Sequence, residues 1–185
     1  MKVKSVLALA AANLGREDLV AMINDCAGDA FGEIASLLRC YNLVENEVAL
    51  DYFPLKREEK VCVRGGVIPF ARLDYAPVTV LAVEEDGKPL QFELRPARIL
   101  LPNSVGERRV IVSYSYSPKE KHLCEKSEFG GRISARLLSF GVACEFCLTN
   151  GQYAEAATWE KKYREALRAA NVLRKRLSVR SRRWV

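Results

Sequence analysis

The chain has 185 residues, of which 49% are hydrophobic and 28% are charged. This composition is typical of a globular protein and excludes a disordered one. The apolar runs are too short to cross a bilayer, so no membrane partner is expected. The formal net charge of +6 equals the six basic residues among positions 174–185, which contain no acid, so residues 1–173 are neutral overall. This distribution indicates one local electrostatic contact rather than a broad DNA-binding face.

The N-terminal segment combines two lysines with an apolar run from Val6 to Ala12, as a secretion signal does. The run is short for a signal, however, and it leads directly into a second helical segment. We therefore expect residues 3–23 to form the first helix of the fold, with Gly15 as a break between its halves. The six cysteines lack the spacing of a small disulfide-bonded domain, which favours a reducing compartment.

The second predicted helix begins near Asp29, a good N-cap residue, and is ended by Pro54. Its apolar residues keep a spacing of three to four over about six turns. From about Val61 to Pro118 the period shifts to two, which predicts four or five short strands. Glycine and proline are frequent in this stretch, as expected for short strands joined by turns.

Two strand signals are clearest in this β-rich stretch. Asp86-Gly87 predicts a hairpin turn, from which residues 91–94 return along residues 78–83. Residues 109–116 form the other signal, with Val110, Val112, Tyr114 and Tyr116 on one face.

Two helical segments follow the strands, one from about Ser127 to Asn150 and one from Tyr153 into the basic tail. The predicted fold class is therefore α+β. It consists of a four-helix antiparallel bundle, a β-rich insertion between helices 2 and 3, and a basic C-terminal tail. The expected boundaries are 1–55 and 127–177 for the bundle, 56–126 for the insertion and 178–185 for the docking tail.

The most conspicuous chemical motif is the C-x-x-C pair Cys144 and Cys147. A zinc site needs four ligands, and no second pair is available to complete one. A thioredoxin-like site requires the pair at the start of a helix after a strand, whereas here both lie deep in an apolar helix. His122, the only histidine, lies in a charged loop. We therefore predict buried structural cysteines, no metal, no cofactor and no catalytic residues.

Acidic pairs and glycine pairs give no catalytic set either. Glu58-Glu59 and Glu84-Glu85-Asp86 are expected beside turns or strand ends, where carboxylates face water. Gly65-Gly66 and Gly130-Gly131 lack the lysine and hydroxyl spacing of a phosphate-binding loop. The sequence therefore favours a protein that works through its surfaces.

The composition of the basic tail does not fit burial in a hydrophobic core. A solvated, frayed terminus is the simple alternative. Arginine and tryptophan are common interface anchors, however, and a tryptophan has little reason to stay in water. We therefore predict a partner-binding tail whose residues are Arg174, Lys175, Arg176, Arg180, Arg182, Arg183 and Trp184.

The layout of the chain resembles the adaptor proteins beneath the portal of tailed bacteriophages, including the tail-tube A or gatekeeper type and related prophage neck proteins. The resemblance covers nearly the whole chain and is carried by residues 37–50, 130–137 and 154–167. The last of these follows the family habit A-x-x-W-x-x-x-Y-x-x-A, with Trp159 and Tyr163 as its aromatic residues.

This resemblance implies a structural virion protein without enzymatic activity. About twelve copies would form a ring below the portal, through which double-stranded DNA passes. The tail would dock on the portal, and the β-rich part would meet the next tail or neck protein. The expected location is the head-to-tail junction of the virion, and the host cytoplasm during assembly.

Three alternatives remain open from the sequence. The first is a neck stopper or tail completion protein at the same junction. The second is a small nucleic-acid-binding accessory protein that uses the arginine-rich tail. The third is a thiol enzyme that uses Cys144 and Cys147.

Overall fold

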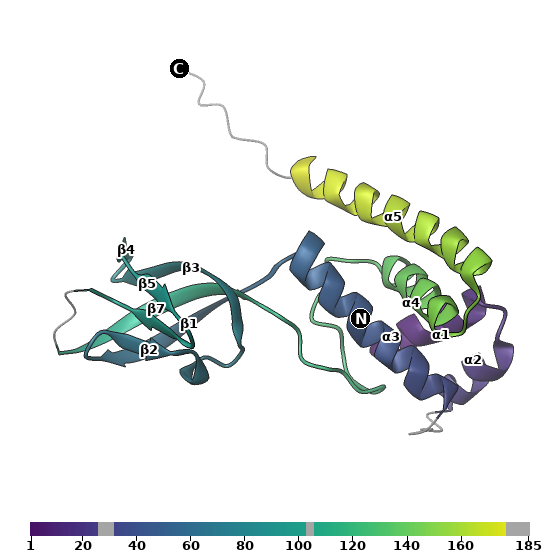
Figure 1. The fold of residues 1–185 in the computed structure, drawn as a ribbon, viewed down its shortest axis with the longest axis horizontal. Coiled ribbons are helices and arrows are strands. Elements are labelled where there is room, and N and C mark those ends of the chain that lie inside the picture. Colours follow the sequence, from purple (N-terminus) through teal and green to yellow (C-terminus); the bar gives the residue numbers. More distant parts are fainter. Residues whose placement is uncertain (26–31, 103–105, 177–185) are drawn as a thin grey trace, which may run out of the picture. The chain divides into compact units, whose positions relative to one another are not determined.

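The computed structural model describes residues 1–25, 32–102 and 106–176, and the chain divides into two compact units. The helical unit contains residues 1–47 and the described residues from Lys119 onward (Figure 1). The β unit contains Val48–Pro118.

In the described ranges, five α-helices form the helical unit. They are α1 (Val3–Asn13), α2 (Glu17–Asn24), α3 (Glu33–Glu47), α4 (Ala135–Thr149) and α5 (Tyr153–Arg176). A π-helical turn, Val48–Tyr52, directly follows α3 at the start of the β unit. The proposed cap of α3, Asp29, lies outside the described residues.

The helix α4 is the centre of the helical unit because α1, α3 and α5 all pack on it. Every α4 residue from Leu137 to Cys144 is buried, so this part of the helix has no solvent-facing side. Small residues make this enclosure possible. Ser139, Gly141 and Ala143 lie on the sides of the helix where a surface helix carries charged side chains, and their size lets neighbouring helices pack closely.

The closest packing in this unit occurs at Gly141. A Cβ atom added at Gly141 would lie 2.7 Å from Val44 Cγ1 of α3 and 3.0 Å from Tyr163 Cε2 of α5. Tyr163 also donates a hydrogen bond from its hydroxyl to Glu47 Oε2 of α3 at 3.2 Å. Three helices therefore meet at a position that accepts only glycine without rearrangement.

The return segment, residues 119–134, crosses α3 and the start of α1 on its way to α4. Glu45 of α3 is buried, and its Oε1 accepts hydrogen bonds from Ser127 Oγ at 2.7 Å and from the Glu128 N–H at 3.0 Å. Backbone bonds join the segment to the N-terminus, including Val3 N–H to the Glu125 carbonyl at 3.0 Å. Burial, followed by the neighbouring Glu45 carboxylate, raises the pKa of the Tyr41 hydroxyl well above its usual range.

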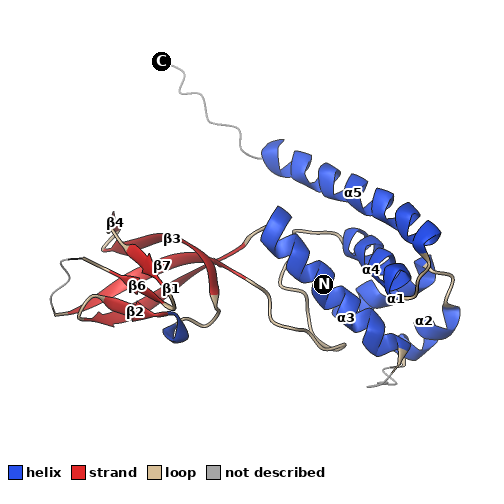
Figure 2. Cartoon of the chain, in the orientation of Figure 1, coloured by secondary structure: helices blue, strands red, loops and turns tan. Residues whose placement is uncertain are grey.

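The β unit is an antiparallel sheet with the strand order β4-β3-β7-β1-β2-β6-β5. Its strands are drawn in red in Figure 2. Its strands are β1 (Leu55–Arg64), β2 (Val67–Pro69), β3 (Pro77–Glu85), β4 (Lys88–Pro89), β5 (Glu93–Arg95), β6 (Arg98–Leu100) and β7 (Glu107–Tyr116), with a 3-10 turn at Phe70–Arg72. The two longest strands, β1 and β7, pair along their full length from Leu55↔Tyr116 to Arg64↔Glu107.

The two clear strand signals of the sequence have different outcomes. The predicted turn at Asp86-Gly87 is confirmed, since both residues have positive φ and Glu85 pairs with Lys88. The predicted return along residues 91–94 is wrong, because β4 ends at Pro89 and Glu93 instead pairs with β6. The Leu90 N–H still donates to the Val83 carbonyl at 2.7 Å, so the pairing with β3 ends just after Pro89. The predicted common face of Val110, Val112, Tyr114 and Tyr116 is confirmed, because all four are buried.

The predicted four-helix bundle with a β-rich insertion is wrong in two respects. The predicted break at Gly15 is confirmed, since Gly15 has a φ of +70°, but it separates two distinct helices, so the described residues contain five helices and not four. The insertion, moreover, is not four or five short strands but a seven-stranded sheet, as counted over the described residues, and it forms a compact unit of its own. Charged residues at the start of β1 hid the alternation of that strand from the sequence.

Replacing Gly141 by alanine tests the packing around α4. We expect Gly141→Ala to lower the free energy of unfolding by about 1–3 kcal/mol, because Val44 and Tyr163 must move to admit the methyl group. The matched control is Gly131→Ala, where an added Cβ meets no atom within 4 Å and φ is not positive. Urea denaturation followed by circular dichroism measures both variants, and equal stability would contradict the proposed close contact.

Candidate functional site

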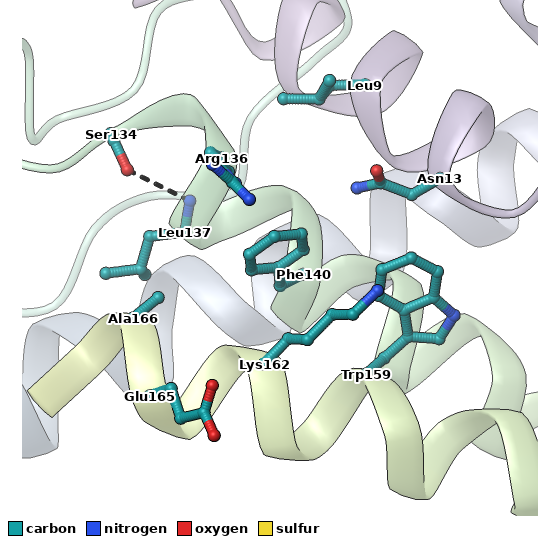
Figure 3. A pocket seen from close by; sticks show the side chains of 10 residues that line it. All are labelled: Leu9, Asn13, Ser134, Arg136, Leu137, Phe140, Trp159, Lys162, Glu165 and Ala166. Atoms are coloured by element: carbon teal, nitrogen blue, oxygen red, sulfur yellow. Dashed lines mark hydrogen bonds between the residues drawn. The ribbon is translucent and has the colours of Figure 1, made fainter. Parts of the chain in front are cut away.

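A pocket of about 640 Å³ opens on the helical unit between α1, the start of α4 and the middle of α5 (Figure 3). Its floor is aromatic. The rings of Phe140 and Trp159 stack with their centroids 5.9 Å apart and their planes at 28°. Leu137 extends this floor, and Leu9 of α1 lines the pocket with 37% of its surface exposed. The floor can therefore receive an apolar or aromatic side chain.

Two cations lie over these rings. The guanidinium carbon of Arg136 is 5.3 Å from the Phe140 ring centroid, and Lys162 Nζ is 4.0 Å from the Trp159 ring centroid. Neither Arg136 nor Lys162 forms an ion pair with another described residue. One lining carboxylate, Glu165, offsets only part of this charge. The pocket therefore combines an apolar floor with a positive rim, which suits a partner group that is apolar and negatively charged.

Local hydrogen bonds fix the start of α4 and with it the pocket. The Leu137 N–H donates to Ser134 Oγ at 3.2 Å, so Ser134 caps the helix. Asn13 Nδ2 of α1 donates to Ser139 Oγ at 3.2 Å, and the same hydroxyl donates to the Arg136 carbonyl at 2.9 Å. These bonds hold α1 against the first turns of α4, where Arg136 stands beside Phe140.

The A-x-x-W-x-x-x-Y-x-x-A pattern of α5 is the stripe that packs on α4. The Ala156 carbonyl accepts a hydrogen bond from the Cys144 thiol at 3.6 Å, and Trp159 stacks on Phe140. Tyr163 lies against Gly141, and Ala166 lines the pocket. The sequence analysis identified this pattern but no pocket, because the pocket exists only where α1 joins α4 and α5.

The structure places the C-x-x-C pair in the core. Cys144 and Cys147 are both buried, as predicted. Burial raises the pKa of the Cys144 thiol to about 11, and burial also raises the pKa of Cys147. Thiols in this environment remain protonated near neutral pH, whereas a nucleophilic cysteine needs a lowered pKa.

The predicted loop position of His122 is confirmed, and its side chain is exposed. Its backbone N–H donates to Glu125 Oε2 at 2.9 Å. Within the described part of the chain, no group of three or more histidine, cysteine, aspartate or glutamate side chains could hold a metal ion.

The predicted docking residues lie mostly beyond what the structure describes. Arg174, Lys175 and Arg176 form the last residues of α5, where only the backbone is described. Arg180, Arg182, Arg183 and Trp184 lie outside the described residues.

A charged and aromatic cluster in the β unit was missed by sequence reasoning. Glu59 lies within β1 and not at a strand end, so the expectation that it faces water is wrong. It pairs with Arg57 Nε at 2.8 Å and accepts a hydrogen bond from the Tyr114 hydroxyl at 2.5 Å. Burial, together with that bond, raises the pKa of Tyr114 well above its usual range. Arg57 also pairs with Asp74 and lies 5.2 Å from the Tyr75 ring centroid.

No model of a known protein family matches this sequence, and no curated protein is significantly similar to it. Among the described helices, none is both long enough and apolar enough to span a membrane. The candidate site therefore rests on its own geometry.

Alkylation of the native protein tests whether the buried thiols can react. We expect iodoacetamide at mildly alkaline pH to modify the exposed Cys124 and, more slowly, Cys62, whose pKa is raised chiefly by its hydrogen bond to Glu107. Cys40, Cys144 and Cys147 should react only after unfolding, because they are buried. Peptide mass spectrometry gives the rates. Modification of Cys144 or Cys147 in the folded protein as fast as Cys124 would favour a thiol enzyme.

Proposed function

We propose that the protein is a non-catalytic structural subunit of the neck of a tailed bacteriophage or prophage. In this role it is a head-to-tail adaptor that forms a ring below the portal and joins the portal to the tail while double-stranded DNA passes. The proposal starts from the resemblance of the chain to such adaptors.

The single observation that carries the proposal is the length of α5 beyond the core. α5 has 24 residues and α4 has 15, and the difference is visible in Figure 1. Ala166 lies at the pocket beside Ser134 and Leu137, at the very start of α4. Leu167 is the last buried residue of α5 up to Val172, where the description of side chains ends. Residues 168–176 therefore continue for about 14 Å beyond the beginning of α4.

This extension leads into the basic tail. Arg168 is exposed on it, and Arg174, Lys175 and Arg176 form its end in sequence. The helix extends beyond the core that it packs on, and its basic residues are concentrated toward its C-terminal end. This arrangement supports a role in docking to another protein.

The arginines of the β unit support weak contact with passing DNA. Duplex DNA is held through phosphate contacts, so a channel wall that bound tightly would stall passage. Four arginines of this unit pair with acids, namely Arg57, Arg64, Arg95 and Arg108. Arg72 instead donates a hydrogen bond to the Cys62 carbonyl. Paired arginines have less free charge to offer to phosphates.

Removing residues 174–185 tests the proposal. We expect the full chain to bind the portal protein encoded in the same genome and the shortened chain to lose that binding. The thermal unfolding of the shortened chain should stay close to that of the full chain, because no buried residue of the described core is removed. Co-purification and mass photometry measure binding, and circular dichroism measures folding.

The same pair of proteins separates the adaptor from a nucleic-acid-binding protein. An accessory protein using the arginine-rich tail would bind duplex DNA with an affinity that falls steeply with salt and is lost in the shortened chain. Portal binding that survives the deletion, or tight DNA binding by the full chain, would contradict the proposed role.

A further inference from the structure

The turn between α4 and α5 carries the most exposed large apolar side chain of the described residues. Tyr153, the first residue of α5, is 71% exposed, and Leu148, in the last turn of α4, is 43% exposed. We call Leu148, Tyr153 and the flanking Glu155 the turn knob. Large apolar side chains grouped on a surface mark sites of contact with other proteins.

The turn knob is also acidic. Glu155 lies in the first turn of α5, and Glu145 lies one turn before the end of α4. Neither carboxylate takes part in any of the ion pairs found among the described residues. Glu155 Oε2 accepts a hydrogen bond from the Cys147 thiol at 4.0 Å, which does not neutralise its charge. The knob therefore offers an exposed aromatic side chain and, on another side of the same helical turn, a carboxylate without a described ion pair.

The pocket offers the complementary chemistry. Its floor of Phe140 and Trp159 is aromatic, and Arg136 and Lys162 at its rim lack acidic partners. An aromatic residue flanked by carboxylates matches both the floor and the rim. The basic segment 174–185 does not match, because its charge has the same sign as the rim.

A chain cannot fill its own pocket with its own knob. Tyr153 and Lys162 are nine residues apart on one rigid helix, which separates them by about 14 Å along its axis. Leu148 and Arg136 are separated by about 18 Å along α4 for the same reason. The knob that fits the pocket must therefore come from another molecule.

We infer that the turn knob of one copy docks in the pocket of the next copy, with Tyr153 over the aromatic floor and Glu155 beside Lys162. Two different surfaces of the chain meet in this contact, so it is heterologous and closes into a ring if the rotation permits. The inference deepens the proposed function and rests on it in one respect, since it assumes that the chain assembles with itself.

Charge reversal tests the contact. We expect Lys162→Glu and Glu155→Lys each to weaken self-association at least about tenfold, because each places like charges together. The double variant should restore association, since it rebuilds the pair with opposite signs. Tyr153→Ala should weaken association by a similar factor through loss of the anchor. Sedimentation velocity of the full chain over a range of concentrations measures each effect.

Two controls separate the contact from general effects. Leu43→Ala removes an apolar side chain that is 60% exposed on α3, outside the knob and the pocket, and it should leave association unchanged. Glu155→Lys also removes an acid from the first turn of α5, which costs helix stability. A folding defect of this kind would not be repaired by Lys162→Glu, so rescue by the double variant identifies the contact.

A photo-crosslink locates the partner surface independently. A benzophenone amino acid in place of Leu9, at the edge of the pocket, should crosslink to a peptide containing Leu148 or Tyr153 of a second copy. Peptide mass spectrometry identifies the linked segment. A crosslink confined to any other segment would overturn the inference.

The outcomes keep this inference apart from the proposed function. Wild-type rings that persist in all three single variants would overturn the knob contact and leave the adaptor role standing. A wild-type chain that stays monomeric but binds portal through residues 174–185 would do the same. Association lost in the single variants and regained in the double variant would support the contact.

Discussion

The close approach of α3 and α5 at Gly141 is the constraint on which the helical unit depends. It lets α4 lie enclosed by α1, α3 and α5, so that the residues from Leu137 to Cys144 are all buried. The same enclosure explains why the thiols of Cys144 and Cys147 lie in the core with raised pKa values. Only the two ends of α4 lie near surfaces that are exposed to solvent. The pocket lies at its start and the exposed Tyr153 lies just past its end, so the surfaces that we assign to assembly follow from the burial of one helix.

The β unit is organised by a different interaction, the long pairing of β1 with β7. Polar residues on its half-buried face are matched to one another, as the bond from the Tyr114 hydroxyl to Glu59 and the pairing of Glu59 with Arg57 show. Because the charges of Arg57 and Glu59 are paired with each other, they fix the local structure and add little positive potential to the surface. In the proposed role, this unit would contact a neighbouring protein and would not bind phosphates tightly.

Sequence reasoning predicted the elements better than their packing. The Asp86-Gly87 turn and the buried face of β7 follow from local rules, since turn chemistry and alternation act over a few residues. The start of β1 was missed because Arg57 and Glu59 occupy positions where the alternation calls for apolar residues, and only Tyr114 and Asp74 from distant segments make them acceptable there. The enclosure of α4 was missed because Gly141 and Ser139 do not count as apolar residues when the spacing of apolar residues along a helix is examined. The pocket needs three segments together, so no local pattern could reveal it.

A cryo-electron microscopy map of the full chain assembled on its portal protein tests the central claim most directly, namely that this protein acts through the surfaces around α4 and α5. The account predicts a closed ring in which density for Tyr153 fills the neighbouring pocket over Phe140 and Trp159, while the end of α5 contacts the portal. A map in which the pockets are empty and α5 ends in solvent, or a preparation in which no ring forms, would contradict it.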